Sequence, residues 1–469
     1  MRLLLAPVAL LLSAAPLLAD IDRTKKPEPL PAPEVSFPDY KDVTLPNGLR
    51  IFVIEDDRKP TLTLRLLIRS GSIFDGKKTG LTALLANLIP RGTEKRSPAD
   101  FAQETDFIGA SLAAAAGPDS ISVTISGLTK YNDLLLDLFS DAVLHPAFAP
   151  EQFARVQRQT LSQLAAEKQE PGALVSKLVG KVIFGAHPYG AYRTPETLSA
   201  ISREDLVAFH KAHFLPNNAS LAVVGDVKAS DILPLIEKAL GGWAKGEVPK
   251  AELPALPEFK AVTVHLLDRP GSVQSNIVVA EPGPVRNNPD LPELNVLNAT
   301  LGGGFSGRLF QNLREKHGWT YGAYSVFDYR KLAGAFEASA ETRNEVTGPA
   351  IAETIKEIER LRTEPVPNAE LELQRQYNVG NYLLSLENTG RTATRVQDID
   401  LYNLPADFYK HYAKRMASTT SEQVLDLAKK YLHPDHLSII VVGEAKQIKT
   451  ELETFGKVQV YDTDIKLVP

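Results

Sequence analysis

The sequence has 469 residues, of which 43% are hydrophobic and 23% charged, a balance that is typical of a folded globular protein and excludes a mainly disordered or fibrous chain. The formal net charge is −5 and no long basic stripe is present, so we expect no nucleic-acid partner. The absence of cysteine excludes disulfides, cysteine-bound zinc, iron–sulfur clusters and thiol nucleophiles.

The N-terminal segment, residues 1–19, is typical of a secretory signal peptide. It has one early positive charge, an apolar run that Pro7 and Pro16 interrupt, and a small residue, Ala19, at the expected cleavage point. The run is too short and too often interrupted for a good membrane span, so we expect no stable membrane insertion after its removal, with a retained anchor as the alternative. The sequence therefore predicts a secreted protein, periplasmic in a Gram-negative host. A Pro-rich tether follows over residues 20–39.

The globular part is expected to begin near Tyr40 with short strands. Asn47-Gly48 lies between the apolar segments Val43–Leu45 and Leu49–Ile54 and predicts a hairpin turn. Further extended segments are expected at Leu62–Arg69, Ser111–Leu128 and Ala219–Gly225. Helical patterns lie between them, over Gly80–Pro90, Pro98–Ile108, Tyr131–Val143, Pro150–Glu167, Ala173–Phe184 and Arg203–His213. Because strands and helices are mixed, the sequence predicts an α+β fold.

The chain contains an internal repeat on either side of a linker. Residues 244–259 are rich in proline and have no periodic pattern, and they separate residues 40–243 from residues 260–469. Ile201–Asp226 aligns with Thr419–Glu444 without a gap, with seven identities in 26 positions. We expect two similar domains from an internal duplication, each a mostly antiparallel sheet with helices packed on it. A chance match between two copies of a common helix–turn–strand unit is the alternative.

The helix expected at Gly80–Pro90 has two different stripes. One stripe is apolar and predicts a core face, and it consists of Leu81, Leu84, Leu85, Leu88 and Ile89. The opposite stripe is small and neutral and consists of Thr82, Ala83, Ala86 and Asn87. A solvated face more often carries Lys or Glu, so the second stripe either packs against another element or lines a cavity. A helix that is buried on both sides is an equally good interpretation.

Other candidate sites in the sequence are incomplete. His210 and His213 are three residues apart, as are His433 and His436, and two histidines alone do not form a metal site. We expect these side chains to be solvated or part of a core. The run Gly302–Gly304 lacks the pattern and the preceding strand of a dinucleotide-binding loop.

Four segments share the motifs of one peptidase family. They are Gly71–Thr93, Phe184–Gly190, Pro216–Asp226 and Gly302–Gly318. Together they resemble the pitrilysin and mitochondrial processing peptidase family of zinc metallopeptidases. The resemblance extends from about residue 43 to about residue 443 and includes the duplication.

The resemblance also places the family's zinc site on residues that cannot bind zinc. Active members carry an inverted motif, H-x-x-E-H, on the first helix after the Gly-Ser turn, so that two histidines four residues apart reach one Zn²⁺. The corresponding residues are Ala83, Ala86 and Asn87, and the position of the third ligand, a glutamate in active members, is Gln163. Alanine has no donor atom, and an amide is a poor zinc ligand beside imidazole. We therefore expect no metal cofactor and no independent activity in this chain.

A second feature of the family is retained. Members that close around a peptide present an Arg and a Tyr, seven residues apart, from the half opposite the zinc, and the matching residues are Arg314 and Tyr321. The pattern predicts a helix over Ser306–His317 that ends at Gly318, followed by a strand. A guanidinium and a phenol can donate hydrogen bonds to a peptide carbonyl and to the oxyanion that forms on it.

The resemblance therefore implies a non-catalytic subunit of a heteromeric zinc peptidase. A homologous catalytic subunit with an intact H-x-x-E-H motif would hold the zinc. This chain would help to bind unfolded peptide, and Arg314 and Tyr321 would complete the partner's site in trans. The alternative is a structural or peptide-binding protein of peptidase-like fold with no role in catalysis.

Overall fold

The structure is a computed structural model that describes residues 37–468, and these residues fall within one compact unit. The predicted signal peptide and nearly all of the tether lie outside the described residues. Within residues 37–468, no helix combines the length and the apolar character that crossing a membrane requires.

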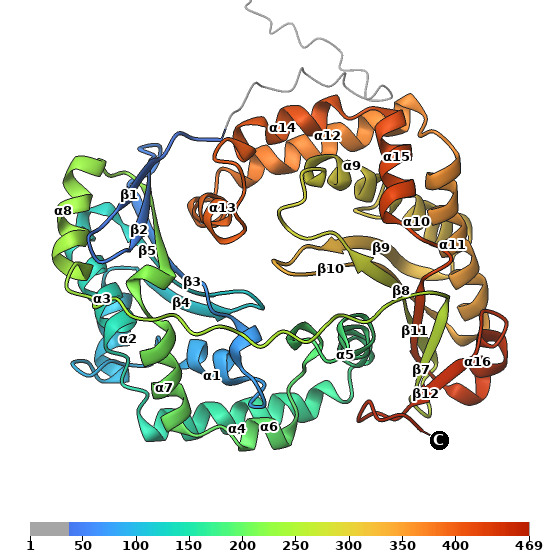
Figure 1. Cartoon of the computed structure of the whole chain (residues 1–469), viewed down its shortest axis with the longest axis horizontal. Coiled ribbons are helices and arrows are strands. Elements are labelled where there is room, and N and C mark those ends of the chain that lie inside the picture. Colours follow the sequence, from blue (N-terminus) through green and yellow to red (C-terminus); the bar gives the residue numbers. More distant parts are fainter. Residues whose placement is uncertain (1–36, 469) are drawn as a thin grey trace, which may run out of the picture. The chain divides into compact units, whose positions relative to one another are not determined.

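The first sheet has six strands in the order β1-β2-β6-β3-β5-β4 (Figure 1). β2 and β6 are parallel, and the other neighbouring pairs of this sheet are antiparallel. The predicted hairpin joins β1 to β2, and Gly48 has a φ of 90°, which glycine adopts readily. The strands are β1 (Lys41–Thr44), β2 (Arg50–Glu55), β3 (Thr61–Ile68), β4 (Ser111–Ala116), β5 (Ile121–Leu128) and β6 (Ala219–Gly225).

The Ser111–Leu128 region is divided into two strands that form a hairpin. β4 and β5 pair in antiparallel register, and the backbone N–H of Gly117 donates to the carbonyl of Ser120 across the turn at 2.8 Å. Pro118 lies in this turn and has no N–H for a strand ladder, which explains why the extended segment is broken there.

The second sheet repeats the topology of the first. Its order is β12-β7-β11-β8-β10-β9, so five strands, β7, β11, β8, β10 and β9, correspond to β2, β6, β3, β5 and β4. The pair β7–β11 is parallel, as β2–β6 is, and only the strand at one edge differs. The strands are β7 (Thr263–Asp268), β8 (Gln274–Gly283), β9 (Thr320–Asp328), β10 (Gly334–Arg343), β11 (Ser438–Gly443) and β12 (Val458–Tyr461). The predicted α+β fold with two similar halves is confirmed.

The repeat also extends to the helices. The helices α4 and α12 each have 18 residues, and α7 and α15 each have 11. Ser202 and Asp205 cap α7 reciprocally, and Thr420 and Gln423 cap α15 in the same way. The matching helices are α4 (Pro150–Glu167) with α12 (Asn368–Ser385), α5 (Pro171–Phe184) with α13 (Thr389–Leu401), and α7 (Arg203–His213) with α15 (Ser421–Tyr431).

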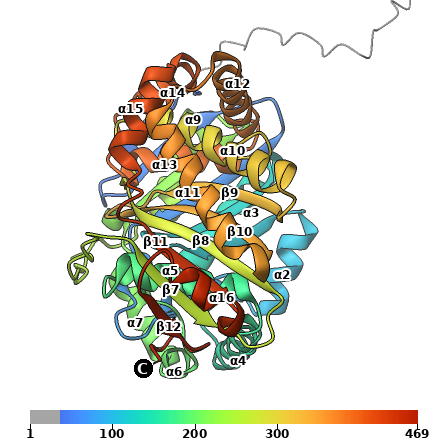
Figure 2. The same cartoon turned by 90° about the vertical axis from the view of Figure 1, so that its right-hand side faces the viewer.

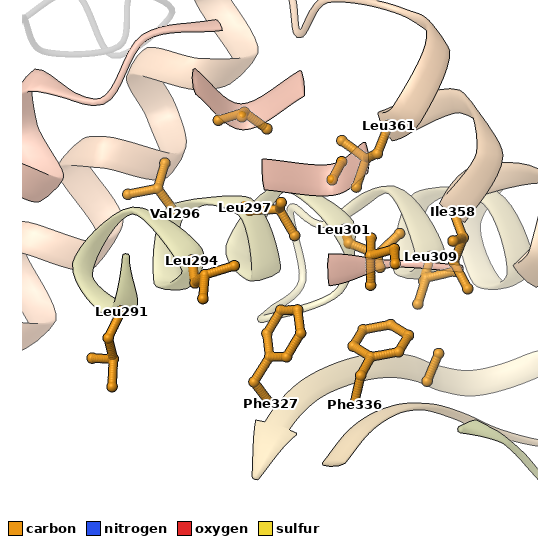
Figure 3. Close-up of a cluster of buried hydrophobic side chains, with 14 of the residues drawn as sticks. Leu291, Leu294, Val296, Leu297, Leu301, Leu309, Phe327, Phe336, Ile358 and Leu361 are labelled. Carbon is orange, nitrogen blue, oxygen red and sulfur yellow. The ribbon is translucent and has the colours of Figure 1, made fainter. Parts of the chain in front are cut away.

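Apolar side chains on one face of each sheet form a core with the helices that cover it. In the second half, Leu294, Leu297 and Leu301 of α9 lie over Phe327 and Phe336, whose ring centroids are 5.1 Å apart (Figure 3). The remaining helices are α1 (Leu81–Leu88), α2 (Pro98–Phe107), α3 (Asn132–Leu144), α6 (Pro195–Ser199), α8 (Ala229–Leu240), α9 (Leu291–Leu301), α10 (Arg308–Phe310), α11 (Thr347–Thr363), α14 (Phe408–Ser418) and α16 (Ala445–Leu452).

The two halves exchange a helix. α5 from the first half packs on β8 and β11 of the second sheet, and α13 from the second half packs on β3 and β6 of the first (Figures 1 and 2). Because β8 corresponds to β3 and β11 to β6, the exchange is reciprocal. The α5 contact is apolar and includes Leu178 against Ile440 and Val442 in one buried cluster.

The α13 contact is polar instead. The Gln397 amide is fully buried, and its Nε2 donates to the carbonyls of Arg65 and Ser220, both at 2.9 Å. The Asp400 carboxylate accepts hydrogen bonds from Arg50 and Arg69 of the first sheet. These bonds fix α13 on the first sheet.

The core begins before the first strand. Phe37, which lies in the segment expected to be tether, is buried in the core, and its ring centroid is 5.3 Å from that of Tyr409. The last residues of this segment are therefore part of the folded unit.

Candidate functional site

The first helix after the Gly-Ser turn, α1, is held at its start by a buried carboxylate. Oδ2 of Asp75 accepts a hydrogen bond from the N–H of Gly80 at 2.8 Å, and Oδ1 accepts one from the N–H of Thr82 at 3.0 Å. These are N–H groups that a helix start leaves without a partner inside the helix. Burial raises the pKa of Asp75. The geometry of α1 is thus fixed independently of any metal.

The residues at the family's zinc positions on α1 offer no metal ligand. Ala86 is buried in the core, Ala83 is half-buried and Asn87 is exposed. The carbonyl of Asn87 accepts a hydrogen bond from Nε of Arg91 at 2.9 Å. Half of the small, neutral stripe of this helix is packed against other elements, since Thr82 is buried as well. Only the Ala83 and Asn87 positions reach the surface.

The helix α4, which carries the predicted third position, packs against α1. Gln163 on α4 is exposed, and the helix is anchored by Val156, which is buried in the core. The nearest carboxylate along α4, Glu167, is bound to Nζ of Lys177 at 2.9 Å and to Nη2 of Arg193 at 3.1 Å. The Glu167 carboxylate therefore already forms ion pairs with two cations.

These residues do not fit a zinc ion. A zinc site needs three or four imidazole, thiolate or carboxylate ligands, and Ala83, Ala86, Asn87 and Gln163 supply none. Over residues 37–468, no group of three histidine, cysteine, aspartate or glutamate side chains is placed to hold a metal ion.

The histidines are structural. His210 Nε2 donates to the carbonyl of Val143 at 2.8 Å, and Nδ1 of His213 lies 2.9 Å from the hydroxyl of Ser70. Burial lowers the pKa of His210 and of His213 to about 4, so both rings are neutral at physiological pH. His433 forms an ion pair with Glu281. The prediction that these histidines do not form a site together is consistent with their separate partners.

Arg314 and Tyr321 lie on adjacent elements of the second half. The segment Arg308–Lys316, expected to be an ordinary helix, is a short α-helix, α10, followed by one π-helical turn, η5 (Gln311–Lys316). Gly318 has a φ of 65° and ends it as predicted, and β9 begins at Thr320. η5, which carries Arg314, packs against β9, which carries Tyr321.

Both side chains are accessible. Tyr321 is 88% exposed, and the Arg314 side chain is 43% exposed. The Arg314 guanidinium lies over the ring of Phe310, 4.9 Å from its centroid, and its closest carboxylate contact is Glu315 at 3.7 Å. Neither side chain is buried in a contact with the rest of the protein, so both are accessible to a bound molecule.

An aromatic cluster beside Arg314 was not predicted from the sequence. The ring of Phe310 contacts those of Phe305, at a centroid distance of 5.0 Å, and Tyr324, at 6.0 Å. Phe305 is 69% exposed although it is a large apolar residue. The sequence signal for this cluster is Phe305, an aromatic residue inside the glycine-rich loop 302–307. Such a loop offers few side chains for the ring to pack against.

The Gly-rich loop is tied to α12 by polar contacts. Arg308 donates to Glu370 from Nε at 2.7 Å and from Nη2 at 3.1 Å, and Nε2 of Gln374 lies 3.2 Å from the hydroxyl of Ser306. The loop carbonyl of Gly302 accepts from the N–H of Ser325 in β9 at 2.9 Å. Hydrogen bonds to α12 and to β9 thus hold the loop that carries Phe305 in place.

Two sequence profiles of one peptidase family match the chain, one for each half. The profile described as "Insulinase (Peptidase family M16)" matches residues 50–193, and the profile described as "Peptidase M16 inactive domain" matches residues 200–378. The chain belongs to peptidase family M16. The family that the sequence motifs indicate is therefore confirmed.

Relatives of this M16 protein span nearly the same length. An uncharacterized zinc protease of Mycobacterium leprae is 24% identical over 397 residues, which are 83% of this chain and 88% of the relative. An uncharacterized zinc protease of Bacillus subtilis is 26% identical over 361 residues, 76% of this chain and 86% of the relative.

Solved structures show the same fold. A peptidase M16 inactive domain from Pseudomonas fluorescens matches with a TM-score of 0.81 and 26% identity, over 86% of this chain and 98% of that one. A protease from Helicobacter pylori matches with a TM-score of 0.80 and 18% identity, over 86% of this chain and 99% of that one. The M16 fold of this chain is thus established.

Proposed function

We propose that this M16 chain is the non-catalytic subunit of a heteromeric zinc peptidase. Its partner is a homologous subunit with an intact H-x-x-E-H motif, which holds the zinc and cuts the peptide. This chain helps to bind the unfolded peptide and contributes Arg314 and Tyr321 to the partner's site. The zinc of the complex belongs to the partner.

One observation carries this proposal. The positions that the motifs assign to zinc binding are occupied by alanine and amide side chains, while Arg314 and Tyr321, seven residues apart as in the family, stay on the surface. The exposure of both side chains leaves their donor groups accessible to another molecule, which supports the proposal.

The chemistry that these groups can supply is electrostatic. An Arg fork and a phenol hydroxyl donate hydrogen bonds to a peptide carbonyl and stabilise the negative charge that develops on its oxygen during attack by water. Removing one such donor typically lowers turnover by about 100- to 1,000-fold. Neither group can generate the nucleophile, so the proposal requires a partner.

The test uses the complex of this chain with its companion subunit, purified from co-expression. Arg314→Ala and Tyr321→Phe are each compared with Arg343→Ala, which removes an exposed arginine at the end of β10. We expect kcat on an unfolded peptide to fall for the first two variants and to stay unchanged for the control, with the same assembly by sedimentation.

Unchanged turnover in both variants would reject the role in trans. If peptide binding to this chain alone then persisted, the alternative of a peptide-binding protein with no catalytic role would be supported instead. Zinc bound stoichiometrically by the isolated chain, with proteolysis that a chelator stops, would overturn the whole assignment.

We also propose that the mature chain acts outside the cytoplasm, in the periplasm if the host is Gram-negative. The support is the signal-peptide pattern of residues 1–19. Cell fractionation followed by N-terminal sequencing tests this, and a cytoplasmic chain that retains its first residue would reject it.

A further inference from the structure

A cavity with a basic lining lies between the two halves, at the C-terminal end of α4. Its volume is about 520 Å³, within the range of small-molecule sites. The first half contributes the end of α4, one face of α5 and residues 192–196. The second half contributes residues 463–466, which belong to the C-terminal tail, here defined as residues 462–468.

Positive charge exceeds negative charge around this cavity. Five cationic side chains line it, against the two acidic side chains of Glu196 and Asp464. The cationic residues are Lys168, Lys177, Lys181, Arg193 and Lys466.

The contacts between these groups leave one positive charge unbalanced. Lys168 pairs with Asp464 at 2.5 Å, and Lys177 and Arg193 share the single carboxylate of Glu167, which lies behind the lining. Lys181 donates to a neutral carbonyl rather than to an acid. Even when Glu196 is set against Lys466 and the nearby carboxylate of Asp462 is counted, the cavity keeps an excess of one cation. Half-buried cations attract anions more strongly than solvated ones.

The wall that the tail provides is well defined. Nζ of Lys181 donates to the carbonyl of Ile465 at 2.6 Å, and Oδ1 of Asp462 accepts from the N–H groups of Asp464 and Lys466, both at 2.9 Å. Ile465 is buried and has a φ of 60°. This conformation is strained for a β-branched residue, and strained residues cluster at active sites, ligand-binding segments and switch regions.

One side of the cavity is apolar. Leu164, Leu174 and Ile465 contribute aliphatic side chains, and Tyr192 contributes its ring. Burial raises the pKa of Tyr192, so its hydroxyl remains a neutral hydrogen-bond donor. The cavity thus combines an apolar wall, one neutral donor and an excess of cations.

We propose that this cavity binds a small organic anion, whose negative charge meets the lysines and whose carbon skeleton lies on the apolar wall. A dicarboxylate and a phosphate monoester share this chemistry. Because the lining comes from both halves, the bound molecule joins the C-terminal tail to α4 and α5. This site is separate from the proposed peptide chemistry and does not depend on it.

The experiment is calorimetric titration of the full chain with glutarate and with phenyl phosphate, which represent the two sources, and with inorganic phosphate, which lacks the apolar part. We expect at least one organic probe to bind with a Kd below about 1 mM. Lys177→Met, which removes a mostly buried cation, should weaken binding about tenfold or more. Lys466→Gln, at an exposed position, should weaken it about threefold and leaves the fold unchanged.

Lys77→Gln is the matched control, because Lys77 is exposed and does not line the cavity. It should leave the Kd unchanged. Hydrogen exchange locates the ligand, since bound probe should slow the exchange of amides in residues 462–468. The proposal is overturned if neither organic probe binds at 20 mM, a concentration about twentyfold above the expected Kd. It is also overturned if both cavity variants bind the probe as tightly as the control, or if inorganic phosphate binds as tightly as the organic probes.

Discussion

The contact between α13 and the first sheet makes a quantitative prediction. Asp400 is mostly buried and accepts hydrogen bonds from Nη1 of Arg50 at 2.8 Å and Nε of Arg69 at 2.9 Å. Arg50 keeps a second carboxylate, Asp42, at 2.6 Å, whereas Arg69 has no other carboxylate within ion-pair distance among residues 37–468. Asp400→Asn therefore leaves mainly Arg69 uncompensated.

The expected cost follows from these contacts. Hydrogen bonds to a charged group contribute about 1.5–3 kcal/mol each, and partial exposure of both arginines reduces this, so we expect Asp400→Asn to lower the free energy of unfolding by about 2–3 kcal/mol. Arg69→Met in the same chain removes the uncompensated charge and should restore about 1 kcal/mol. Asp407→Asn, at an exposed aspartate, is the control and should cost less than about 0.5 kcal/mol.

Urea denaturation followed by tryptophan fluorescence measures this, because each half contains one of the two tryptophans. Trp243 donates from Nε1 to the carbonyl of Phe214 in the first half, and Trp319 stacks on His317 in the second. Variants with a single tryptophan report each half separately, and both midpoints should move together. A cost equal to that of the Asp407 control, or a shift of only one midpoint, would refute the reasoning.

Three further predictions concern other parts of the molecule. Phe37→Ala should lower the unfolding free energy in urea by about 3–5 kcal/mol, since it empties a buried aromatic site, and a cost below 1 kcal/mol, well under this estimate, would show that the segment is only a tether. The hydrogen bond to Glu281 raises the pKa of His433, so the stability that this bond contributes is complete below about pH 6.5 and is lost as the pH rises through the raised pKa. Urea denaturation curves measured across this pH range should therefore show that the wild type is more stable than His433→Gln at low pH. This difference in stability should disappear as the pH rises. Chelator treatment should leave the melting temperature of the isolated chain unchanged. The triple variant Ala83→His/Asn87→His/Gln163→Glu should bind zinc, which native mass spectrometry measures. Zinc bound to the wild type would contradict this prediction.

Where local signals are strong, the sequence predicts the elements well. The helices Pro150–Glu167 and Arg203–His213 have the predicted bounds, because a proline or a capping serine marks each start. The strand Ala219–Gly225 is also as predicted, since a short run of buried apolar residues ends in glycine. The apolar pattern predicts one extended segment over Ser111–Leu128, whereas the structure has two strands, because the Gly117-Pro118 turn signal outweighs the pattern.

The site is predictable only in part. Motif spacing identifies Ala83, Ala86 and Asn87 as positions on one helix, and the structure shows that Ala86 is core while Asn87 is exposed, a difference that depends on how α4 packs. The π-helical turn that carries Arg314 has no sequence pattern of its own. The exchange of helices between the halves likewise rests on contacts between residues far apart in the chain, which periodicity cannot reveal.

That exchange has a consequence for the origin of the protein. A single half, expressed alone, would leave uncovered the sheet face that the other half's helix protects, and α5 would expose its own apolar side. A half-length ancestor would cover this face if two copies formed a symmetric homodimer, in which each copy packs its helix on the sheet of the other. Gene fusion through a proline-rich connection would then preserve the swap while freeing the two copies to diverge.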